Sequence, residues 1–316
     1  MWFAFIGVVL GLLALDLGVL HRESRVIGVR ESLLTSSFYL ALGAGFGAWV
    51  WWSLGADSGM AYLTGFAIEK ALAIDNVFVI ATIFAFFAIP PALQHRVLFW
   101  GILGVIVLRA VMIAAGAAVV ADFSWVLYVF AAILIATGVK MLVIADRPHD
   151  VAGNPVLRFV RNRFRITEGL EGERFFVRRT EPATGRAVWY ATPLFLALAM
   201  VELADLIFAI DSIPAIFAIT TDPFVVYTSN IFAILGLRAL YFALAAMVHR
   251  FRYLKAALAA VLIFIGSKIF VADLLGWTKF PPALSLGITF GLIAAGVAWS
   301  LVRTRGAAAP GSASAS

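Results

Sequence analysis

The amino-acid sequence consists mainly of apolar runs that are long enough to cross a lipid bilayer as helices. A transmembrane helix needs about 20 apolar residues. Runs of this kind occur at residues 2–20, 33–54, 60–88, 93–120, 123–143, 191–220, 224–248, 256–275 and 282–302. Because 63% of the residues are hydrophobic and only 13% are charged, soluble classes are excluded. The sequence predicts an all-α polytopic membrane protein with about nine transmembrane helices, in one domain over residues 1–302.

Charged residues between the apolar runs predict the orientation of the chain. Nine arginines lie between Arg147 and Arg186, whereas the connections before and after this segment carry no Lys or Arg. Since cytoplasmic connections hold the excess of Lys and Arg, we expect the N-terminus outside and the C-terminus in the cytoplasm. Membrane topology thus explains the net charge of +6, and no nucleic-acid partner is expected.

The long connection at residues 146–190 is predicted to be a cytoplasmic basic loop. Its stretch NPVLRFVRNRFRI has an Asn cap, a Pro at the first helical position and interleaved arginines, which predicts an amphipathic helix on the inner leaflet. The stretch ERFFVRRTEPATGRAVWY predicts a hairpin that turns at residues 182–185. The loop serves either as a topological anchor or as a contact for other membrane proteins. Residues 303–316 are small and polar, and are expected to form a disordered tail.

Acidic residues recur with the same spacing in two parts of the chain. The segment EKALAIDNVFVI begins at Glu69, and the similar segment DLIFAIDSIPAI begins at Asp205. Six residues later, Asp75 and Asp211 occupy equivalent positions. The two acidic segments are therefore interpreted as copies of one repeat.

The repeat continues through basic residues further along the chain. The motif LRA occurs twice, and GVKMLVIAD in the first copy corresponds to GSKIFVAD in the second. These matches pair Arg109 with Arg238, and Lys140 with Lys268. Each copy covers three helices, at about 60–146 and 191–275. Because the copies begin on opposite sides of the membrane, the sequence predicts two inverted three-helix repeats, an architecture of many secondary transporters.

The charges inside the predicted spans form a candidate site. A charge at the bilayer centre costs about 2.5 to 3.5 kcal/mol on insertion scales, so such residues indicate function or pairing. The candidate cation ligands are Glu69, Asp75, Asn76, Glu202, Asp205, Asp211 and Ser212. The bases predicted to pair with acids or to line a pathway are Lys70, Arg109, Lys140, Arg238 and Lys268. The alternative is that all of these charges are buried ion pairs that hold the helices together.

An unbroken helix would not direct all of the acids to one point. Glu202 and Asp205 are three residues apart and share a helix face, but Asp211 lies about 120° around an ideal helix from Asp205. A break beside Asp75 or near Pro214 would bring the acids closer and would free backbone carbonyls as ligands. These two positions are the predicted places for unwinding.

The available side chains favour a hard divalent cation. The chain has no Cys, and its four His residues lie in connections or at the ends of spans. The spans therefore offer oxygen ligands, which suit Mn²⁺, Mg²⁺ or Ca²⁺. No phosphate-binding Gly-Lys loop occurs in the sequence, and no nucleophile and base stand at a recognisable spacing. We expect neither an ATP-driven pump nor an enzyme, and no cofactor.

The segments around the acidic motifs resemble a known family. They are IDNVFVI, VELADLIFAIDSIPAIFAITTDPFVVYTSNIFAILGLRALYF, and RITEGLEGERFFVRR followed by ATPLFLALAMVE. Over about residues 10–275 the chain resembles the TerC family of bacterial and plastid membrane proteins, in particular its Alx branch. The resemblance implies a bacterial inner-membrane protein of the larger LysE-type transporter group, with efflux of Mn²⁺ as its transported substrate. It also implies metal binding by the acids Glu69, Asp75, Glu202, Asp205 and Asp211.

Three functions compete on these grounds. A transporter that exports Mn²⁺ against about 100 mV works against roughly 2 × 2.3 kcal/mol, so it needs coupling, most simply to protons. A membrane assembly or protein-interaction factor would instead use the basic loop at 146–190 to contact other membrane proteins. The family labels of tellurite resistance and redox modulation do not follow from the residues, although Arg109 and Arg238 are cationic groups that an oxyanion would require.

The transport hypothesis predicts that Asp75→Asn and Asp211→Asn each abolish metal transport without preventing insertion in the membrane. The measurement is Mn²⁺ flux in proteoliposomes under an imposed pH gradient. Unchanged flux in either variant would remove that residue from the site.

Overall fold

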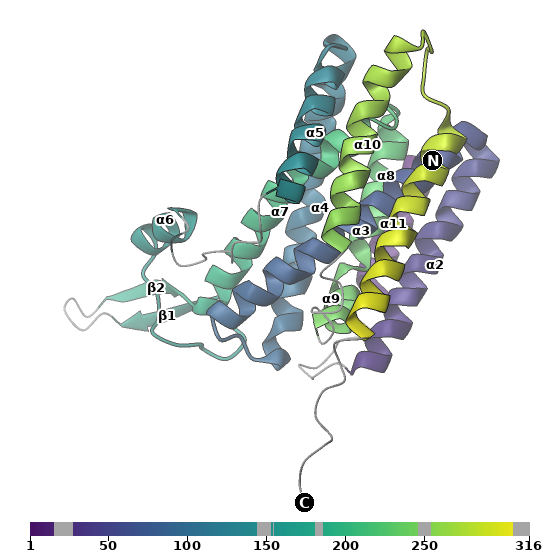
Figure 1. Ribbon diagram of the computed structural model, residues 1–316. Helices are drawn as coiled ribbons and strands as arrows, with labels where there is room; N and C mark the ends of the chain where they lie inside the picture. Colours follow the sequence, from purple (N-terminus) through teal and green to yellow (C-terminus); the bar gives the residue numbers. More distant parts are fainter. Residues whose placement is uncertain (16–27, 144–152, 154, 181–185, 246–253, 306–316) are drawn as a thin grey trace, which may run out of the picture.

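The computed structural model describes residues 1–15, 28–143, 153, 155–180, 186–245 and 254–305. These residues form an elongated bundle of helices, with one short helix and a β-hairpin projecting from its side (Figure 1). The architecture confirms the prediction of a mostly helical, polytopic membrane protein. Residues 16–20 and 246–248 of the predicted spans, Asn154, the hairpin turn at 182–185 and the tail beyond Arg305 lie outside the described residues.

Each apolar run coincides with a helix or with a bent pair of helices. The helices of the bundle are α1 (Trp2–Leu15), α2 (Val29–Leu54), α3 (Ala56–Phe86), α4 (Pro91–Asp122), α5 (Val126–Val143), α7 (Pro193–Phe217), α8 (Pro223–Leu235), α9 (Leu237–Ala245), α10 (Leu254–Leu274) and α11 (Pro282–Arg305). The last helix runs three residues beyond the predicted end at 302.

The number of membrane spans is not confirmed as nine. Among the described residues, six helices are long and apolar enough to cross a membrane, or seven if α8 and α9, bent by 41°, count as one span. Helix α3 is 31 residues long, but it carries Asp57, Glu69, Lys70 and Asp75. The described part of α1 has only 14 residues. Charge within α3 and the short described length of α1 therefore separate these two helices from the six that are long and apolar enough to span.

Proline is the first residue of five of the eleven helices in the described part of the chain. Its fixed φ and missing N–H suit a position where the helix has no use for an N–H donor. Helices that begin with proline are α4, α6 (Pro155–Arg163), α7, α8 and α11. At α8 the preceding Asp222 also caps the helix, because its carboxylate accepts a 2.8 Å hydrogen bond from the backbone N–H of Phe224.

Helix α3 lies at the centre of the bundle. It packs against α2, α7, α8, α9 and α11, and its buried residues extend from Gly59 to Phe84. A helix buried on several faces can be apolar all round, which explains why no single stripe stands out in its sequence. The charged residues of α3 are thereby placed among other helices.

Helices α5 and α10 approach each other closely through glycines. A Cβ atom at Gly138 would lie 2.7 Å from the carbonyl oxygen of Ala259, and one at Gly266 would lie 2.6 Å from that of Ala131. Small residues of this kind let two membrane helices pack backbone against backbone. Gly138 and Gly266 are also equivalent positions of the sequence repeat, so each copy contributes the same contact.

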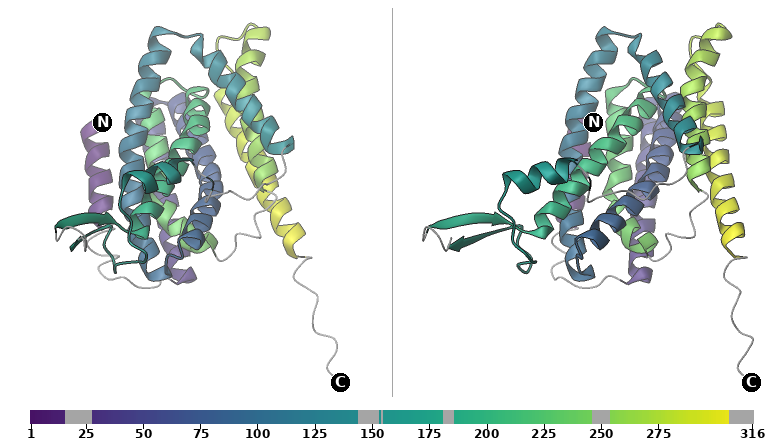
Figure 2. Two further views of the ribbon diagram at one scale, coloured as in Figure 1. Left: turned by 90° about the vertical axis from the view of Figure 1, so that its left-hand side faces the viewer. Right: turned by 60° about the vertical axis from the view of Figure 1, so that its left-hand side comes forward.

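The predicted basic helix and hairpin are present at one side of the bundle. Helix α6 packs against α7, and strands β1 (Phe176–Thr180) and β2 (Ala187–Ala191) pair in antiparallel order. Figure 2 shows the hairpin projecting sideways near the end of the bundle where α11 finishes, whereas the α4–α5 and α10–α11 connections lie at the other end.

Substituting the interface glycines will destabilise the protein. Gly138→Ala and Gly266→Ala each place a methyl group against backbone atoms, which we expect to lower the free energy of unfolding by about 1 to 3 kcal/mol. Gly287→Ala in α11 is the matched control, because nothing lies within 4 Å of its Cβ position. Thermal unfolding in detergent, followed by tryptophan fluorescence, measures the difference. Equal stability of all three variants would argue against the close packing.

Candidate functional site

Two carboxylates from the two similar acidic segments of the sequence meet one arginine inside the bundle. Arg109 of α4 donates from Nε and Nη2 to the two carboxylate oxygens of Asp205 on α7, at 3.1 and 2.9 Å. Its Nη1 also donates to the carboxylate of Glu69 on α3. The side chains of the three residues are at most 7% exposed. We call Glu69, Arg109 and Asp205 the ion-pair layer.

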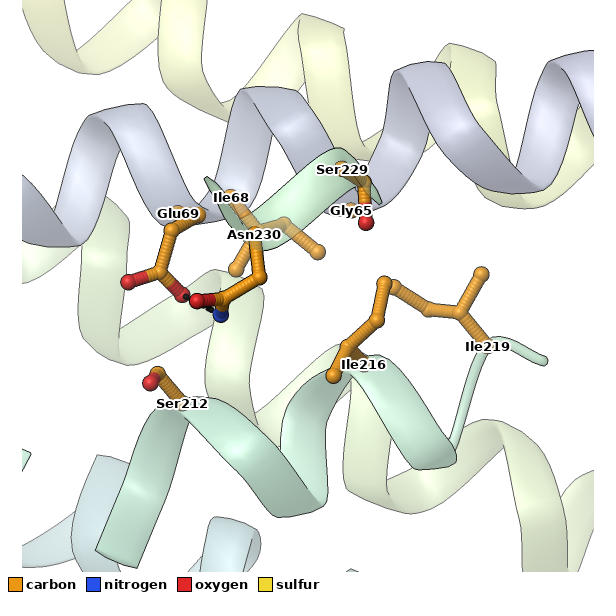
Figure 3. A pocket seen from close by; sticks show the side chains of 8 residues that line it. All are labelled: Gly65, Ile68, Glu69, Ser212, Ile216, Ile219, Ser229 and Asn230. Carbon is orange, nitrogen blue, oxygen red and sulfur yellow. Dashed lines mark hydrogen bonds between the residues drawn. The ribbon is translucent and has the colours of Figure 1, made fainter. Parts of the chain in front are cut away.

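Uncharged side chains complete the hydrogen bonds of this layer. Nη1 of Arg109 also lies 3.1 Å from Ser212 Oγ and 3.2 Å from Asn230 Oδ1. The Asn230 amide donates to the other oxygen of Glu69 at 3.2 Å, the contact drawn in Figure 3. Since Nη1 has two hydrogens for three acceptors, at least one of these bonds is shared. Every carboxylate oxygen of the layer therefore accepts a hydrogen bond.

A narrow crevice lies on one side of the ion-pair layer. It is lined by residues that include Gly65 and Glu69 of α3, Ser212 and Ile216 of α7, and Asn230 of α8. Figure 3 shows Glu69 and Asn230 facing each other, with Ser212 on the neighbouring helix. The crevice, which we call the Asn230 crevice, is too narrow for a water molecule.

A small cavity lies against Asp205, and we call it the Asn76 cavity. Its lining includes Asn76 and Ile80 of α3, Gly101 of α4, Asp205 of α7 and Leu237 of α9. Its volume of about 20 Å³ is enough for one water molecule. The Oδ1 atom of Asn76 is buried and has no hydrogen-bond partner among the described residues. Such an atom fits a bound water or cation, since buried acceptors are normally paired.

The two spaces lie on opposite sides of the ion-pair layer. Along α3, Gly65 borders the crevice and Asn76 borders the cavity, with Glu69 between them. Along α7 the order is reversed, because the cavity residues up to Phe208 precede the crevice residues from Ser212. An ion that moved from one space to the other would have to pass the carboxylates of the layer.

The structure does not gather all of the predicted acids. Asp211 accepts a 2.8 Å hydrogen bond from Thr137 of α5, and the carboxylate of Glu202 lies against Gly104 of α4. Asp75 is half-buried on α3. Within the described ranges, no three Asp, Glu or His side chains are placed together so that they could hold a metal ion.

The remaining predicted bases differ in burial and in position. Lys268 is buried and donates to Ser285 of α11 at 3.1 Å, and Arg238 is buried at the start of α9. Lys140 is exposed near the end of α5. The ammonium group of Lys70 lies beside Gly236, where a Cβ would be 2.8 Å from it. Arg109 pairs with two of the predicted acids, Glu69 and Asp205.

The prediction of unwound helices at the acids is wrong. Helix α3 continues through Asp75 to Phe86, and α7 continues through Pro214 to Phe217. Pro214 removes one hydrogen bond, the one that a backbone N–H would donate to the carbonyl of Ile210, yet the helix continues for three more residues. The break occurs instead at Gly236, between α8 and α9.

Two functional positions were missed from the sequence. Asn230 lies in the segment YTSNIF, where a cluster of polar residues in an apolar run was the available signal. Gly236 has Lys70 and Tyr39 within 2.9 Å of its Cβ position, so a larger residue would not fit beside α2 and α3. A lone glycine in an apolar run gives no indication of such a contact.

Fold and site together define a polytopic helical membrane protein in which a buried arginine–carboxylate layer separates two internal spaces. The sequence matches the family described as "Integral membrane protein TerC family" over residues 54–308. The chain belongs to the TerC family. This match includes α11, which lies beyond the 10–275 over which the resemblance was recognised.

Similar proteins extend over almost the whole chain. An "Uncharacterized membrane protein" of Rickettsia bellii is 48% identical, covering 96% of this chain and 97% of that protein. Proteins of Salmonella typhi and Escherichia coli, both named "Putative membrane-bound redox modulator Alx", are 45% and 44% identical, covering 93% of this chain and 91% of each relative. No solved structure matches the chain.

Removing Arg109 will leave two carboxylates in the site without a cation. We expect Arg109→Gln to lower the free energy of unfolding by about 3 to 5 kcal/mol, the range for breaking a buried ion pair. The control is Arg96→Gln, because Arg96 pairs with Glu173 at the surface, where an ion pair contributes about 0 to 1 kcal/mol. Denaturant unfolding in micelles checks both values, and similar losses in the two variants would contradict the burial of the layer.

Proposed function

We propose that the protein is a secondary transporter that exports divalent metal cations, Mn²⁺ above all, across the bacterial inner membrane in exchange for protons. The observation that carries the proposal is the pair of buried carboxylates, Glu69 and Asp205, with a separate space on each side. A transported ion needs ligands that it can reach in turn from the two sides of the membrane. Ionisable residues inside a membrane protein commonly mark such a pathway.

The internal repeat supports this proposal. Glu69 and Asp205 hold equivalent positions in the two copies, and their helices α3 and α7 pass the site in opposite directions. Helix α3 packs against α8 of the second copy, and α7 packs against α4 of the first copy. This exchange of partners is expected for two inverted units, α3–α5 and α7–α10, related by a two-fold axis in the membrane plane.

The side chains around the layer supply oxygen ligands on both sides. Asn76 and Asp205 border the cavity, and Glu69, Ser212 and Asn230 border the crevice. Carboxylate, amide and hydroxyl oxygens suit Mn²⁺, and His and Cys are not required. In our proposal Asp75, Glu202 and Asp211 bind the ion at other points of its pathway. The ion is the transported substrate, and no cofactor is needed.

The orientation follows from the basic residues. With the N-terminus outside and the C-terminus in the cytoplasm, the end of α11 faces the cytoplasm. Helix α3 finishes at this end of the bundle (Figure 1), so the Asn76 cavity belongs to the cytoplasmic half and would receive the outgoing ion. Export of a divalent cation against the membrane potential then costs roughly 4.6 kcal/mol per 100 mV. Protons that bind on the outside and enter the cytoplasm would offset this cost.

A second candidate function is contact with other membrane proteins. It is favoured by the projecting region of α6 and the hairpin, where Phe159, Phe164 and Trp189 are exposed beside arginines. Redox modulation, the role for which the Alx relatives are named, would not use a thiol of this chain, because the chain has no Cys. Shortening residues 155–185 tests the contact function, since transport should survive this change.

Transport requires the two carboxylates of the layer. We expect Glu69→Gln and Asp205→Asn each to reduce proton-driven Mn²⁺ flux in proteoliposomes roughly 30-fold or more, because losing one partner of a buried charge pair costs about 2 to 5 kcal/mol and each 1.4 kcal/mol is tenfold. Glu173→Gln is the control, since Glu173 lies at the surface with Arg96. Absence of any divalent-cation flux in the folded wild-type protein would overturn the proposal and favour the contact function.

A further inference from the structure

We infer that Arg109 is a tethered cation, which closes the route between the two spaces and competes with the transported divalent ion for Glu69 and Asp205. This inference rests on the proposed transport function and deepens it. It assigns to one arginine the role of keeping the pathway shut when no ion is bound.

The position of Arg109 makes it a barrier. Two nitrogens of its guanidinium, Nε and Nη2, donate to Asp205 of α7, and the third, Nη1, donates to Glu69 of α3. Glu69 borders the Asn230 crevice and Asp205 borders the Asn76 cavity. The guanidinium therefore bridges Glu69, the acid that borders the crevice, and Asp205, the acid that borders the cavity.

The carboxylates cannot easily bind both cations. All four of their oxygens already accept hydrogen bonds, three from Arg109 and one from Asn230. A divalent ion added to two carboxylates and one guanidinium would bring like charges within a few ångströms in a region shielded from water, where repulsion is strong. Binding of the ion therefore requires the guanidinium to move away.

A displaced guanidinium has acceptors close by. Nη1 lies within 3.2 Å of Ser212 Oγ and Asn230 Oδ1, both of which are uncharged. Nη1 can stay hydrogen-bonded to these two oxygens while Nε and Nη2 leave Asp205 and Nη1 leaves Glu69, and in that state the two oxygens bind the arginine and not the metal ion. In the ion-free state the guanidinium of Arg109 neutralises the two acids. In the metal-bound state the divalent ion neutralises them instead.

Competition makes a measurable prediction for metal affinity. When a binding-competent state is populated only in part, the apparent affinity falls by that fraction. Lysine has one compact ammonium group, whereas the planar guanidinium of arginine binds a carboxylate through two nitrogens. In Arg109→Lys the cationic side chain should therefore leave Glu69 and Asp205 more readily. We expect Arg109→Lys to lower the half-saturating Mn²⁺ concentration by on the order of tenfold, and Arg109→Gln by more.

The experiment titrates the purified full chain in detergent with MnCl₂ and records the rise in melting temperature, since a ligand of the native state stabilises it. Arg96→Gln is the control and should titrate like the wild type. Arg109→Lys keeps the charge, so it decides the question even if Arg109→Gln does not fold. An unchanged or higher half-saturating concentration in Arg109→Lys overturns the inference.

The outcome for the wild type separates the two proposals. If the wild type transports and binds Mn²⁺ but Arg109→Lys binds no more tightly, the competition is wrong and the transport function stands. If neither the wild type nor the variants bind or transport Mn²⁺, the transport function fails and the inference falls with it. Tighter binding by Arg109→Lys supports both.

Discussion

The interaction on which the structure depends is the contact of Arg109 with Glu69 and Asp205. Three charged side chains stand in the middle of an apolar bundle, where each alone would be costly. They are tolerated because Asp205 receives two hydrogen bonds from one guanidinium and Glu69 receives one from it and one from Asn230. This requirement ties α3, α4, α7 and α8 together at one level, and it accounts for the polar residues that these helices place there.

Close helix packing surrounds this polar centre. The glycines at 138 and 266 join α5 to α10, Gly104 makes room for Glu202, and Gly236 makes room for Lys70 and Tyr39. In a bilayer the helices gain little from excluding water from one another, so packing and hydrogen bonds hold them together. The helices that carry the ion-pair layer are therefore positioned largely by small residues at their contacts.

Membership of the TerC family and the geometry of the layer bear on function in different ways. The family and its relatives establish an integral membrane protein, and the Alx relatives are named for redox modulation. In our proposal, the arrangement of acids, arginine and two internal spaces instead serves to move a cation. The chain has no Cys, so a thiol reaction of its own is not available to it.

The sequence by itself determined the helices of the bundle, because apolar runs act locally, and it marked Pro155 as the first residue of α6. It also singled out Glu69, Arg109, Asp205 and Ser212 as charged or polar groups that needed a reason. Only the tertiary structure decided that these residues meet, that Asp75 and Asp211 lie elsewhere on unbroken helices, and that Asn230 joins the layer. Arg109 is 40 residues from Glu69 and 121 from Asn230 in the chain, and which helix faces come together over such separations depends on the packing of the whole bundle.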